Sequence, residues 1–571
     1  MTFVEKDIFV TQAICQVLEQ AGVDLVLGMP GGDIMRVFDA LYDYQDTIRT
    51  LLVREESLAA IMAEVYGRTT GRPAVVMAQG AWVLANAGMG TLEALTGGSP
   101  MVILTDLSDK IPYSHHSPTQ TGTGHYGNWD ALQTFRGFMK EVMVAYDPAQ
   151  AVQMTQLAIK HAVSGCPGPV GVVYFGGALK GKVGPSSKLN LYKTSGYLFS
   201  DQRSADPMAT AQAAQVLANA KKPVIISGGG VRVGQASRAL TALAETLSAP
   251  VVTTSGGKGS FNESHPLAGG AFNEYGLDAA AKLLGESDVV LAVGTRLAPG
   301  DTIRQHPGLI DPKRQTLIQI DIEPRHVGWS FPVEHGLIGD AVSVLRDLGE
   351  RLAGHKPPAG VDGVARVKAA AESEGFFDVK ESVSDEMPIL PQRLIRDLRQ
   401  ALPDDAIVAC DAGENRIFML HHYRTKAVGG FVQPSSTGGM GYAIPSALGL
   451  KLAFPDRAAV AICGDGGFAM TMNGLMSSLE LNLPIVVLVL NNGMLGWVQH
   501  VQGNRQIASS LGDYNYAAIA KAMGCEAVTL EKPADIVPTI KKAVASGKTT
   551  VIDVIISRTE SWEKVRCKLG L

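Results

Sequence analysis

The sequence lacks three features that would each define a class of protein. Its six cysteines form no C-x-x-C pair, which excludes zinc ribbons and thioredoxin-type redox sites and favours small buried side chains. Lys and Arg number 50 against 55 Asp and Glu, so there is no basic excess and we expect no nucleic acid partner. The longest apolar runs, such as residues 485–490, are far shorter than the roughly 20 residues of a membrane span, so we expect no membrane partner.

The N-terminal residues also lack the pattern of a signal peptide. Residues 1–7 include acids and no apolar segment of roughly 7–15 residues. We therefore expect a soluble protein of the cytoplasm.

The composition that remains is that of an ordinary globular protein. Hydrophobic residues make up 46% and charged residues 18% of the chain, and 63 glycines make it slightly glycine-rich. At roughly 150 residues per domain, a chain of 571 residues should form three or four domains.

Short β-branched runs alternate with longer Ala- and Leu-rich segments of helical period, which is typical of parallel-sheet α/β domains. The fold class we predict is α/β, with three doubly wound parallel-sheet domains at residues 1–182, 200–356 and 385–571. Residues 181–204 resemble a linker, and a charged segment at 361–387 precedes the third domain. The predicted strands are 25–27, 50–53, 74–77, 101–104 and 170–174; 223–226, 251–253, 289–293 and 317–322; and 406–409, 458–463, 485–490 and 550–556.

The most informative passage lies in the third block. A predicted strand ends in the run Gly464 to Gly467, which contains Asp465, and 24 residues separate Gly466 from Asn491 and Asn492 at the end of the next strand. A helix is expected between them, over residues 469–482. Parallel strands present their carboxyl ends at one edge of the sheet, so the carboxylate and the carboxamide should meet there. Both are hard oxygen ligands suited to Mg²⁺ that also holds phosphate, and the glycines let main-chain N–H groups approach that phosphate.

Either turn alone is a common feature, but their spacing resembles the thiamine diphosphate signature. Over essentially its whole length the chain is similar to the acetolactate synthase-like branch of thiamine diphosphate enzymes. The resemblance implies a pyrimidine-binding first domain, a Rossmann-like central domain and a diphosphate-binding third domain. It also implies Mg²⁺ bound by Asp465, the Asn492 side chain and the main-chain carbonyl of Met494.

The resemblance implies further contacts to the cofactor. Residues 411–415 match a segment that contacts the diphosphate, but Glu414 and Asn415 stand where the family usually has Gln-His. An acid beside a diphosphate is unfavourable, so we expect Glu414 to point elsewhere or to contact a hydroxyl. The Gly438 carbonyl and the Met440 N–H would bind the aminopyrimidine, and the long Met440 side chain would wedge between the two rings. The cofactor-binding residues implied are Gly413, Glu414, Asn415, Gly438, Met440, Gly464, Asp465, Gly466, Gly467, Asn492 and Met494.

Two acids, Glu55 and Glu56, stand where a predicted strand meets an Ala-rich helix. Alone, such a pair is typical of a surface helix start. The family pattern H-E-x-x-A-A falls on these residues, so the resemblance implies that Glu56 is the catalytic carboxylate that activates the pyrimidine. In the family this carboxylate and the cofactor come from different subunits, which implies a homodimer with shared sites and, beyond it, a homotetramer.

The central block has glycines at several predicted strand ends, at residues 228–230, 294 and 339. These positions resemble those where acetolactate synthase holds FAD and where relatives hold ADP or nothing, so the sequence leaves the occupant open between the three. Residues 122–127 match G-x-G-x-x-G formally but follow no strand directly, so we interpret them as a loop.

Several departures from acetolactate synthase concern the substrate. The usual G-P-G-A-T-N stretch is replaced by residues 79–86, no glutamine stands in the loop 125–128, and the family's acceptor-handling arginine is missing after residues 296–300. The loop 109–128 is instead rich in His and Tyr, which are either pocket groups or exposed loop residues. His421 and His422 are expected on a helix surface. The residues proposed to line a substrate pocket are Gly31, Gln79, His125, Tyr126, Asn128 and Trp497.

The function predicted is a thiamine diphosphate- and Mg²⁺-dependent C–C lyase or carboligase. It would act on a small-molecule 2-keto acid or related carbonyl donor through a C2-carbanion and an enamine. The alternatives are a simple 2-keto acid decarboxylase, a C–C hydrolase of the same family, or a non-catalytic cofactor-binding relative, against which Glu56 argues.

Overall fold

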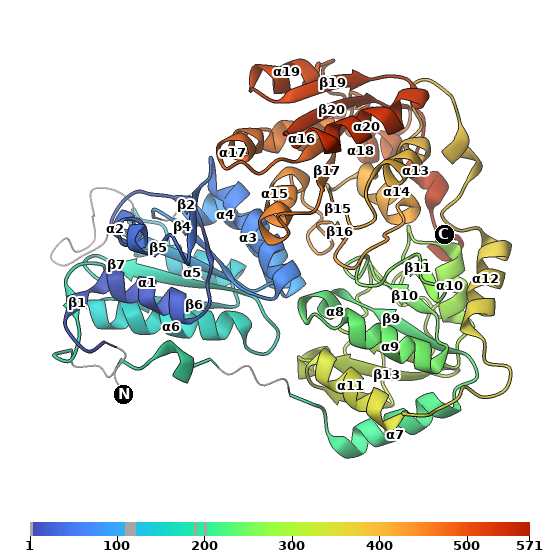
Figure 1. The fold of residues 1–571 in the computed structure, drawn as a ribbon, viewed down its shortest axis with the longest axis horizontal. Helices are drawn as coiled ribbons and strands as arrows, with labels where there is room; N and C mark the ends of the chain where they lie inside the picture. The colour runs from blue at the N-terminus through green and yellow to red at the C-terminus, as the bar shows by residue number, and fades with distance from the viewer. Residues whose placement is uncertain (1–3, 81, 109–120, 188–190, 199–202, 571) are drawn as a thin grey trace. The chain divides into compact units, whose positions relative to one another are not determined.

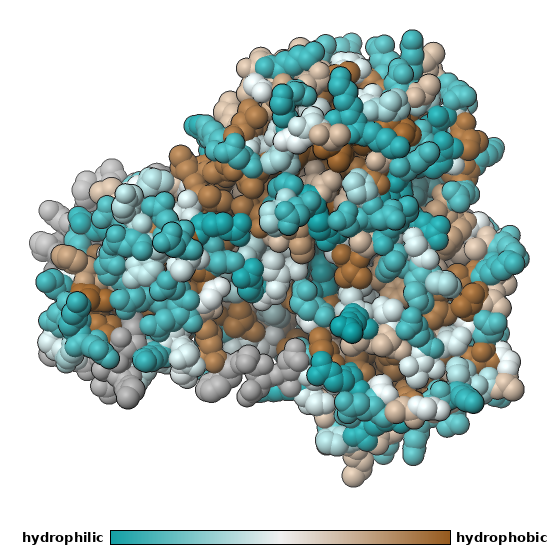
Figure 2. Space-filling view, in the orientation of Figure 1, coloured by the Kyte–Doolittle hydropathy of each residue, from teal (hydrophilic) through white to brown (hydrophobic). Residues whose placement is uncertain are grey.

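The chain forms two compact units, residues 1–201 and residues 202–571 (Figure 1). The computed structural model describes residues 4–80, 82–108, 121–187, 191–198 and 203–570. No helix within these ranges combines the length and apolar character needed to span a bilayer. Figure 2 shows one face, on which hydrophilic residues are spread throughout and hydrophobic residues form several groups between them.

The first unit is built on a parallel six-stranded sheet of order β3-β2-β4-β5-β7-β6. Its central strands are buried along their length because helices cover both faces, which is the usual state of a parallel sheet. The strands are β2 (Leu25–Met29), β3 (Arg49–Leu52), β4 (Ala74–Ala78), β5 (Met101–Leu107), β6 (Glu141–Ala145) and β7 (Pro169–Phe175). The helices are α1 (Val10–Gln20), α2 (Met35–Ala40), α3 (Glu56–Thr70), α4 (Trp82–Gly97), α5 (Ala131–Phe138) and α6 (Pro148–Val163).

The second unit contains two further parallel sheets, of which the first has the order β11-β10-β9-β12-β13-β14. Counted within the sheet this is 3-2-1-4-5-6, the Rossmann order. Its strands are β9 (Pro223–Ser227), β10 (Val251–Thr253), β11 (Ala268–Ala271), β12 (Val289–Val293), β13 (Thr316–Asp321) and β14 (His335–Ile338). Its helices are α7 (Pro207–Asn219), α8 (Gly229–Val233), α9 (Ser237–Leu247), α10 (Asp278–Gly285), α11 (Ala341–Arg351) and α12 (Gly363–Glu374).

The third sheet has the order β16-β15-β17-β18-β20-β19 and repeats the connectivity of the first, 2-1-3-4-6-5 when strands are counted within each sheet. Its strands are β15 (Ile407–Cys410), β16 (Phe431–Val432), β17 (Ala459–Gly464), β18 (Val486–Asn491), β19 (Glu526–Leu530) and β20 (Thr550–Ile555). Its helices are α13 (Pro391–Ala401), α14 (Glu414–His422), α15 (Ala443–Ala453), α16 (Asp465–Thr471), α17 (Gly474–Glu480), α18 (Gly496–Gln502), α19 (Tyr516–Ala522) and α20 (Ile536–Ala545). Short 3₁₀ turns occur at Leu41–Tyr44, Thr194–Gly196, Pro324–His326, Lys380–Val383, Pro533–Asp535, Trp562–Val565 and Lys568–Gly570.

The structure confirms the α/β fold with three parallel sheets and every strand that the sequence predicted. Three details were wrong. The predicted helix 469–482 is two short helices, α16 and α17, and the first already begins at Asp465. The expected linker begins inside the first unit, where β8 (Lys182–Val183) pairs with β1 (Ile8–Phe9). His422 is buried, and Nδ1 of the neighbouring His421 lies 3.2 Å from the carbonyl oxygen of Tyr275 in the central domain.

Lys258 and Glu263 of the central domain form a fully buried ion pair, and Glu263 also bonds to Thr425 of the third domain. The Lys258 Nζ lies 2.8 and 3.0 Å from the two carboxylate oxygens of Glu263, and Glu263 Oε2 also accepts the Thr425 N–H at 2.7 Å. Burial lowers the pKa of Lys258, and the Glu263 carboxylate opposes that shift.

Breaking this pair from one side should be costly. We expect Lys258→Met to lower the free energy of unfolding by about 3–5 kcal/mol, because it leaves the Glu263 carboxylate buried without a cation. Lys258→Met combined with Glu263→Gln should recover most of the loss, since Gln still accepts the Thr425 N–H. Urea denaturation of the three proteins measures this, and a double variant less stable than the single one would contradict it.

Candidate active site

Asp465 lies at the carboxyl edge of the third sheet, directly after β17. Its Oδ2 accepts the main-chain N–H groups of Gly493 at 2.7 Å and Asn492 at 3.2 Å, and its Oδ1 accepts that of Gly466 at 3.2 Å. Burial raises the pKa of Asp465, and these three donors counteract the rise. The fold thus brings Asp465 to the loop after β18, as the spacing in the sequence predicted.

The residues at this edge fit a magnesium ion by the chemistry of their donors. Asp465 and Asn492 are buried side by side, and Asn492 Oδ1 also accepts the Met494 N–H at 3.3 Å. Among the described residues, no three His, Cys, Asp or Glu side chains converge on one point. One carboxylate, one carboxamide and main-chain carbonyls are instead a small set of hard oxygen ligands, which suits Mg²⁺ that takes its remaining ligands from a phosphate and water.

The turn at Gly438 to Gly441 is fixed by Asp411, the first residue after β15. Asp411 Oδ1 accepts the Gly441 N–H at 2.9 Å and Oδ2 accepts the Ala443 N–H at 3.1 Å, at the start of α15. Burial raises the pKa of Asp411 to about 6. A Cβ at Gly466 would lie 2.9 Å from Cε of Met440, so the predicted wedge residue packs on the Gly464–Gly467 turn. The sequence placed Asp411 in the segment implied to contact the diphosphate, but it did not predict that this side chain anchors the turn at Gly438 to Gly441.

The two residues that depart from the family's Gln-His, Glu414 and Asn415, make different contacts in the segment after Asp411. Gly413 has a positive φ of 82° at the start of α14, a conformation that favours glycine. Asn415 Nδ2 donates to the Ala412 carbonyl at 2.8 Å, and its amide lies against Gly464. Glu414 Oε1 faces His500 Nδ1 at 2.7 Å and accepts the Trp562 N–H at 2.9 Å. The Glu414 carboxylate is therefore already engaged by protein groups.

In the first unit, Glu56 begins α3 and is buried, while Glu55 before it is extended and half-buried. Asn86 of α4 donates from Nδ2 to Glu56 Oε2 at 2.9 Å. Sequence reasoning missed Asn86 as a functional residue, and the available signal was its place at the end of the altered stretch 79–86. Asn86 therefore bonds one carboxylate oxygen of Glu56, Oε2, and does not bond the other, Oε1.

Helices α3 and α4, which carry Glu56 and Asn86, are tied together by a buried charge cluster. Arg68 donates to Glu64 Oε1 at 2.7 Å and to Glu93 Oε1 at 2.7 Å, and all three side chains are almost fully buried. Such a cluster fixes the register of the two helices, since moving one would leave charges unpaired.

The loops after β2 and β4 bring together two predicted pocket residues, because a Cβ at Gly31 would collide with the Gln79 side chain. Asp106, buried at the end of β5, accepts the Asp33 N–H at 2.7 Å and the Gly80 N–H at 3.3 Å. Burial raises the pKa of Asp106, and these N–H groups oppose it. Asp106 thus fixes both loops at the switch point of the first sheet.

The remaining predicted pocket residues lie in one loop of the first unit and on one helix of the second. Tyr126 is 98% exposed and His125 is exposed, and Asn128 Nδ2 donates to Thr123 Oγ1 at 3.0 Å. Residues 122–127 form a loop, as predicted, and residues 109–120 lie outside the described ranges. Trp497 belongs to the second unit, on α18, where one face of its indole stacks on Trp562 at 4.3 Å between ring centroids.

The glycines of the central sheet have a packing role. A Cβ at Gly228 or Gly230 would collide with the backbone of Gly294, which has a positive φ of 59°. These residues are glycine because two loops approach closely at the switch point between β9 and β12. They therefore give no separate support for a nucleotide at this edge.

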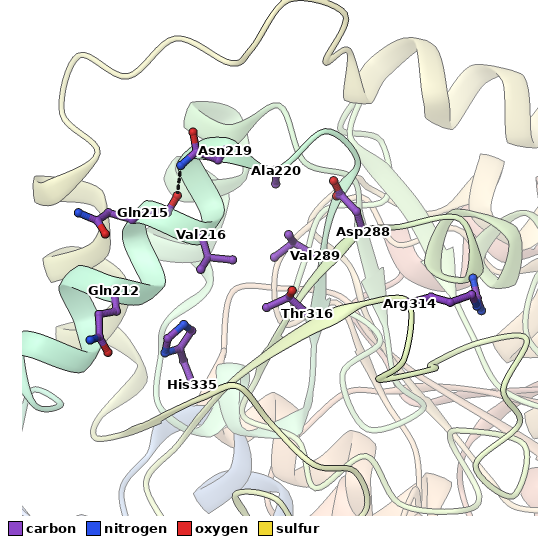
Figure 3. Close-up of a pocket in the computed structure, with 10 residues that line it drawn as sticks. All are labelled: Gln212, Gln215, Val216, Asn219, Ala220, Asp288, Val289, Arg314, Thr316 and His335. Atoms are coloured by element: carbon purple, nitrogen blue, oxygen red, sulfur yellow. Dashed lines mark hydrogen bonds between the residues drawn. The ribbon is translucent and has the colours of Figure 1, made fainter.

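A polar hollow of about 590 Å³ lies at the opposite, amino edge of the central sheet (Figure 3). Its lining includes Asp288, Thr316 and His335 at the starts of β12, β13 and β14. The Asp288 carboxylate already accepts hydrogen bonds from the main-chain N–H groups of Lys221 at 2.7 Å and Lys222 at 2.8 Å. Ligands of α/β sheets bind at the carboxyl edge, so this hollow is not the expected nucleotide position.

Comparison with known proteins identifies all three domains. Residues 9–124, 210–348 and 411–554 match the N-terminal TPP binding domain, the central domain and the C-terminal TPP binding domain of thiamine pyrophosphate enzymes. The probable acetolactate synthase large subunit of Methanocaldococcus jannaschii is 30% identical over 566 residues, covering 97% of this chain and 93% of the relative. The sulfoacetaldehyde acetyltransferase of Castellaniella defragrans is 30% identical over 577 residues, covering 96% and 93%. The acetolactate synthase of Mycobacterium bovis is 29% identical over 575 residues, covering 97% and 89%.

The three parallel sheets, with a carboxylate beside a carboxamide at one sheet edge, and these matches together identify a cofactor-dependent α/β enzyme. The chain belongs to the acetolactate synthase-like family of thiamine diphosphate enzymes, thiamine pyrophosphate being another name for the same cofactor. The predicted resemblance is confirmed, as is the expectation of a carboligase or lyase at the level of the family.

Proposed function

We propose that this enzyme makes or breaks the carbon–carbon bond beside the carbonyl of a 2-keto acid or related donor, using thiamine diphosphate and Mg²⁺. The observation that carries the proposal is the buried Asp465 carboxylate bonded to the loop of Asn492 and Gly493, at the carboxyl edge of the third sheet. When bound, thiamine diphosphate supplies a carbon nucleophile that adds to the donor carbonyl and accepts its electrons.

Residues of the third domain would hold the cofactor. Asp465, the Asn492 side chain and the Met494 carbonyl would bind Mg²⁺, and the main chain of residues 464–467 and 413–415 would face the diphosphate. The Gly438 carbonyl and the Met440 N–H would bind the pyrimidine. The contact of Met440 with Gly466 and the fixing of its turn by Asp411 support this assignment.

Glu56 would hold and move the proton at the pyrimidine ring. Its burial and its bond from Asn86 support this role, because a carboxylate anchored through one oxygen presents the other in a fixed direction. Glu56 and Asp465 belong to different units of the chain, and we propose that two copies share each site in a homodimer, with a homotetramer as the larger assembly.

A carboligase is favoured over a simple decarboxylase or a C–C hydrolase by overall similarity. We expect the enzyme to be a poor producer of acetolactate, since the loop 125–128 has no glutamine and residues 296–300 are not followed by the family's arginine. A screen of pyruvate, other 2-keto acids, 1,2-diketones, 2-hydroxyacyl-CoA donors and sulfoacetaldehyde, with product analysis, tests the proposal. Rapid acetolactate formation from pyruvate would show that these departures do not govern the choice of acceptor.

For the central domain, the three candidate states are bound FAD, bound ADP and no bound nucleotide. The glycines at its switch point favour none of them, since backbone packing accounts for them. The visible absorbance of the purified protein distinguishes FAD from the other two.

A further inference from the structure

Glu414 and His500 form a contact that links two segments of the proposed cofactor site. His500 Nδ1 lies 2.7 Å from Glu414 Oε1, and the side chains are 14% and 8% exposed, respectively. Glu414 is the first residue of α14, next to Gly413 and Asn415. His500 lies on α18, which follows the loop of Asn492 and Met494.

The neighbours of the pair determine that one ring nitrogen of His500, Nε2, carries a hydrogen. His500 Nε2 is 3.1 Å from the Arg558 carbonyl, which can only accept, so Nε2 carries a hydrogen. Between Nδ1 and Glu414 Oε1 there is then one shared proton, on either atom. Both forms keep the hydrogen bond, and the Trp562 N–H at 2.9 Å holds the same carboxylate oxygen.

The surrounding contacts place α18 against the C-terminal segment and α14. The Trp497 ring of α18 stacks on Trp562 with 9° between the planes, and Tyr275 packs edge-on against both indoles. A Cβ at Gly496 would collide with the Glu414 carboxylate and lie 3.4 Å from Asn492 Nδ2. The close approach of Glu414 to the start of α18 therefore requires glycine at position 496.

We propose that Glu414 and His500 are positioning residues that clamp the loop of Asn492 and Met494 to the segment 413–415, and so raise the affinity for Mg²⁺ and thiamine diphosphate without contacting the diphosphate. The proposal rests on the proposed function. It explains why an acid is tolerated beside a diphosphate site, because the carboxylate is bonded to an imidazole and a main-chain N–H that offset its charge. Groups that orient metal ligands in this way typically contribute 10–100-fold in metal affinity.

Calorimetric titration of thiamine diphosphate into the full-length protein with saturating Mg²⁺ tests the clamp. Glu414→Ala and His500→Ala should each weaken cofactor binding by about 10–100-fold. The double variant should be no weaker than the weaker single one, because both changes cut the same link. His500→Asn, whose amide can donate in place of Nδ1, should bind within a few fold of the wild type.

Glu560→Gln is the matched control, since Glu560 is a buried acid close enough to Glu414 to act on it electrostatically, but it bonds Gln392 and Lys564 instead. It should leave the affinity within about twofold. The binding stoichiometry gives the folded fraction of each variant, so a loss of folding is separated from a loss of affinity.

Unchanged affinity in the single variants would overturn the clamp, and so would effects of the two single changes that multiply in the double variant. In either case, binding of thiamine diphosphate by the wild type would leave the proposed function intact. An equal loss of thiamine diphosphate affinity in Glu560→Gln would show that removing a negative charge is enough to weaken binding, and this would also overturn the clamp. A wild type that binds no thiamine diphosphate would overturn the proposed function itself.

Discussion

The Asp465→Ala variant is expected to lose Mg²⁺-dependent binding of thiamine diphosphate. Asp465 is the carboxylate at the proposed metal position. It also accepts hydrogen bonds from the main-chain N–H groups of Asn492 and Gly493, which lie in the loop that carries the other proposed ligands. Its removal takes away one metal ligand and the anchor of that loop. Without the metal bridge, the diphosphate charge would meet only main-chain donors.

Calorimetry with thiamine diphosphate and Mg²⁺ measures this effect, and we expect no detectable binding by the variant. Asp513→Ala is the control, because Asp513 is 94% exposed and its ion partner Arg558 is itself largely exposed. It should bind like the wild type. Unchanged affinity in Asp465→Ala would remove Asp465 from the metal site.

The Glu56→Gln variant is expected to bind the cofactor within a few fold of the wild type and to turn over about 10²–10⁴ times more slowly, the usual effect of losing a positioned acid–base group. Gln can still accept the hydrogen bond from Asn86, so the side chain should stay in place. Glu55→Gln should have a much smaller effect. Glu55 lies just outside α3 and is only half-buried, and adjacent residues at a helix start point in different directions.

Mixed dimers of Glu56→Gln and Asp465→Ala subunits test whether the site is shared. If each site combines Glu56 of one subunit with Asp465 of the other, one site of the mixed dimer carries both changes and the other carries neither. Two inactive proteins should then recover activity when co-expressed. Verified mixed dimers that remain inactive would contradict the shared site.

The strands that the sequence did not predict are those that lack the continuous apolar pattern of an interior strand or are very short. Apart from the two-residue pair β1 and β8, they are β6, β11, β14, β16 and β19, and each lies at the edge of its sheet. Edge strands have one unpaired side and more exposed residues, so β14 and β19 lack the continuous apolar run of a central strand. Interior strands such as β17 and β18 were predicted because every residue but the last is buried.

The candidate site divides in the same way. Asp465 and Asn492 could be predicted because they end neighbouring parallel strands, so their spacing in the chain determines their meeting in space. The bond of Asn86 to Glu56 and that of His500 to Glu414 join residues 30 and 86 positions apart on different elements. No periodicity or motif relates such residues, and only the packing of the helices brings them together.

The most direct test of the account is the rate at which the C2 proton of bound thiamine diphosphate exchanges with deuterium, followed by NMR after acid quench. It needs no knowledge of the substrate. The account predicts exchange much faster on the wild-type enzyme than for free thiamine diphosphate, and slower by about 10²–10⁴ in Glu56→Gln, whose cofactor remains bound. Exchange on the wild-type enzyme at the rate of the free cofactor, or equally fast in Glu56→Gln, would contradict it.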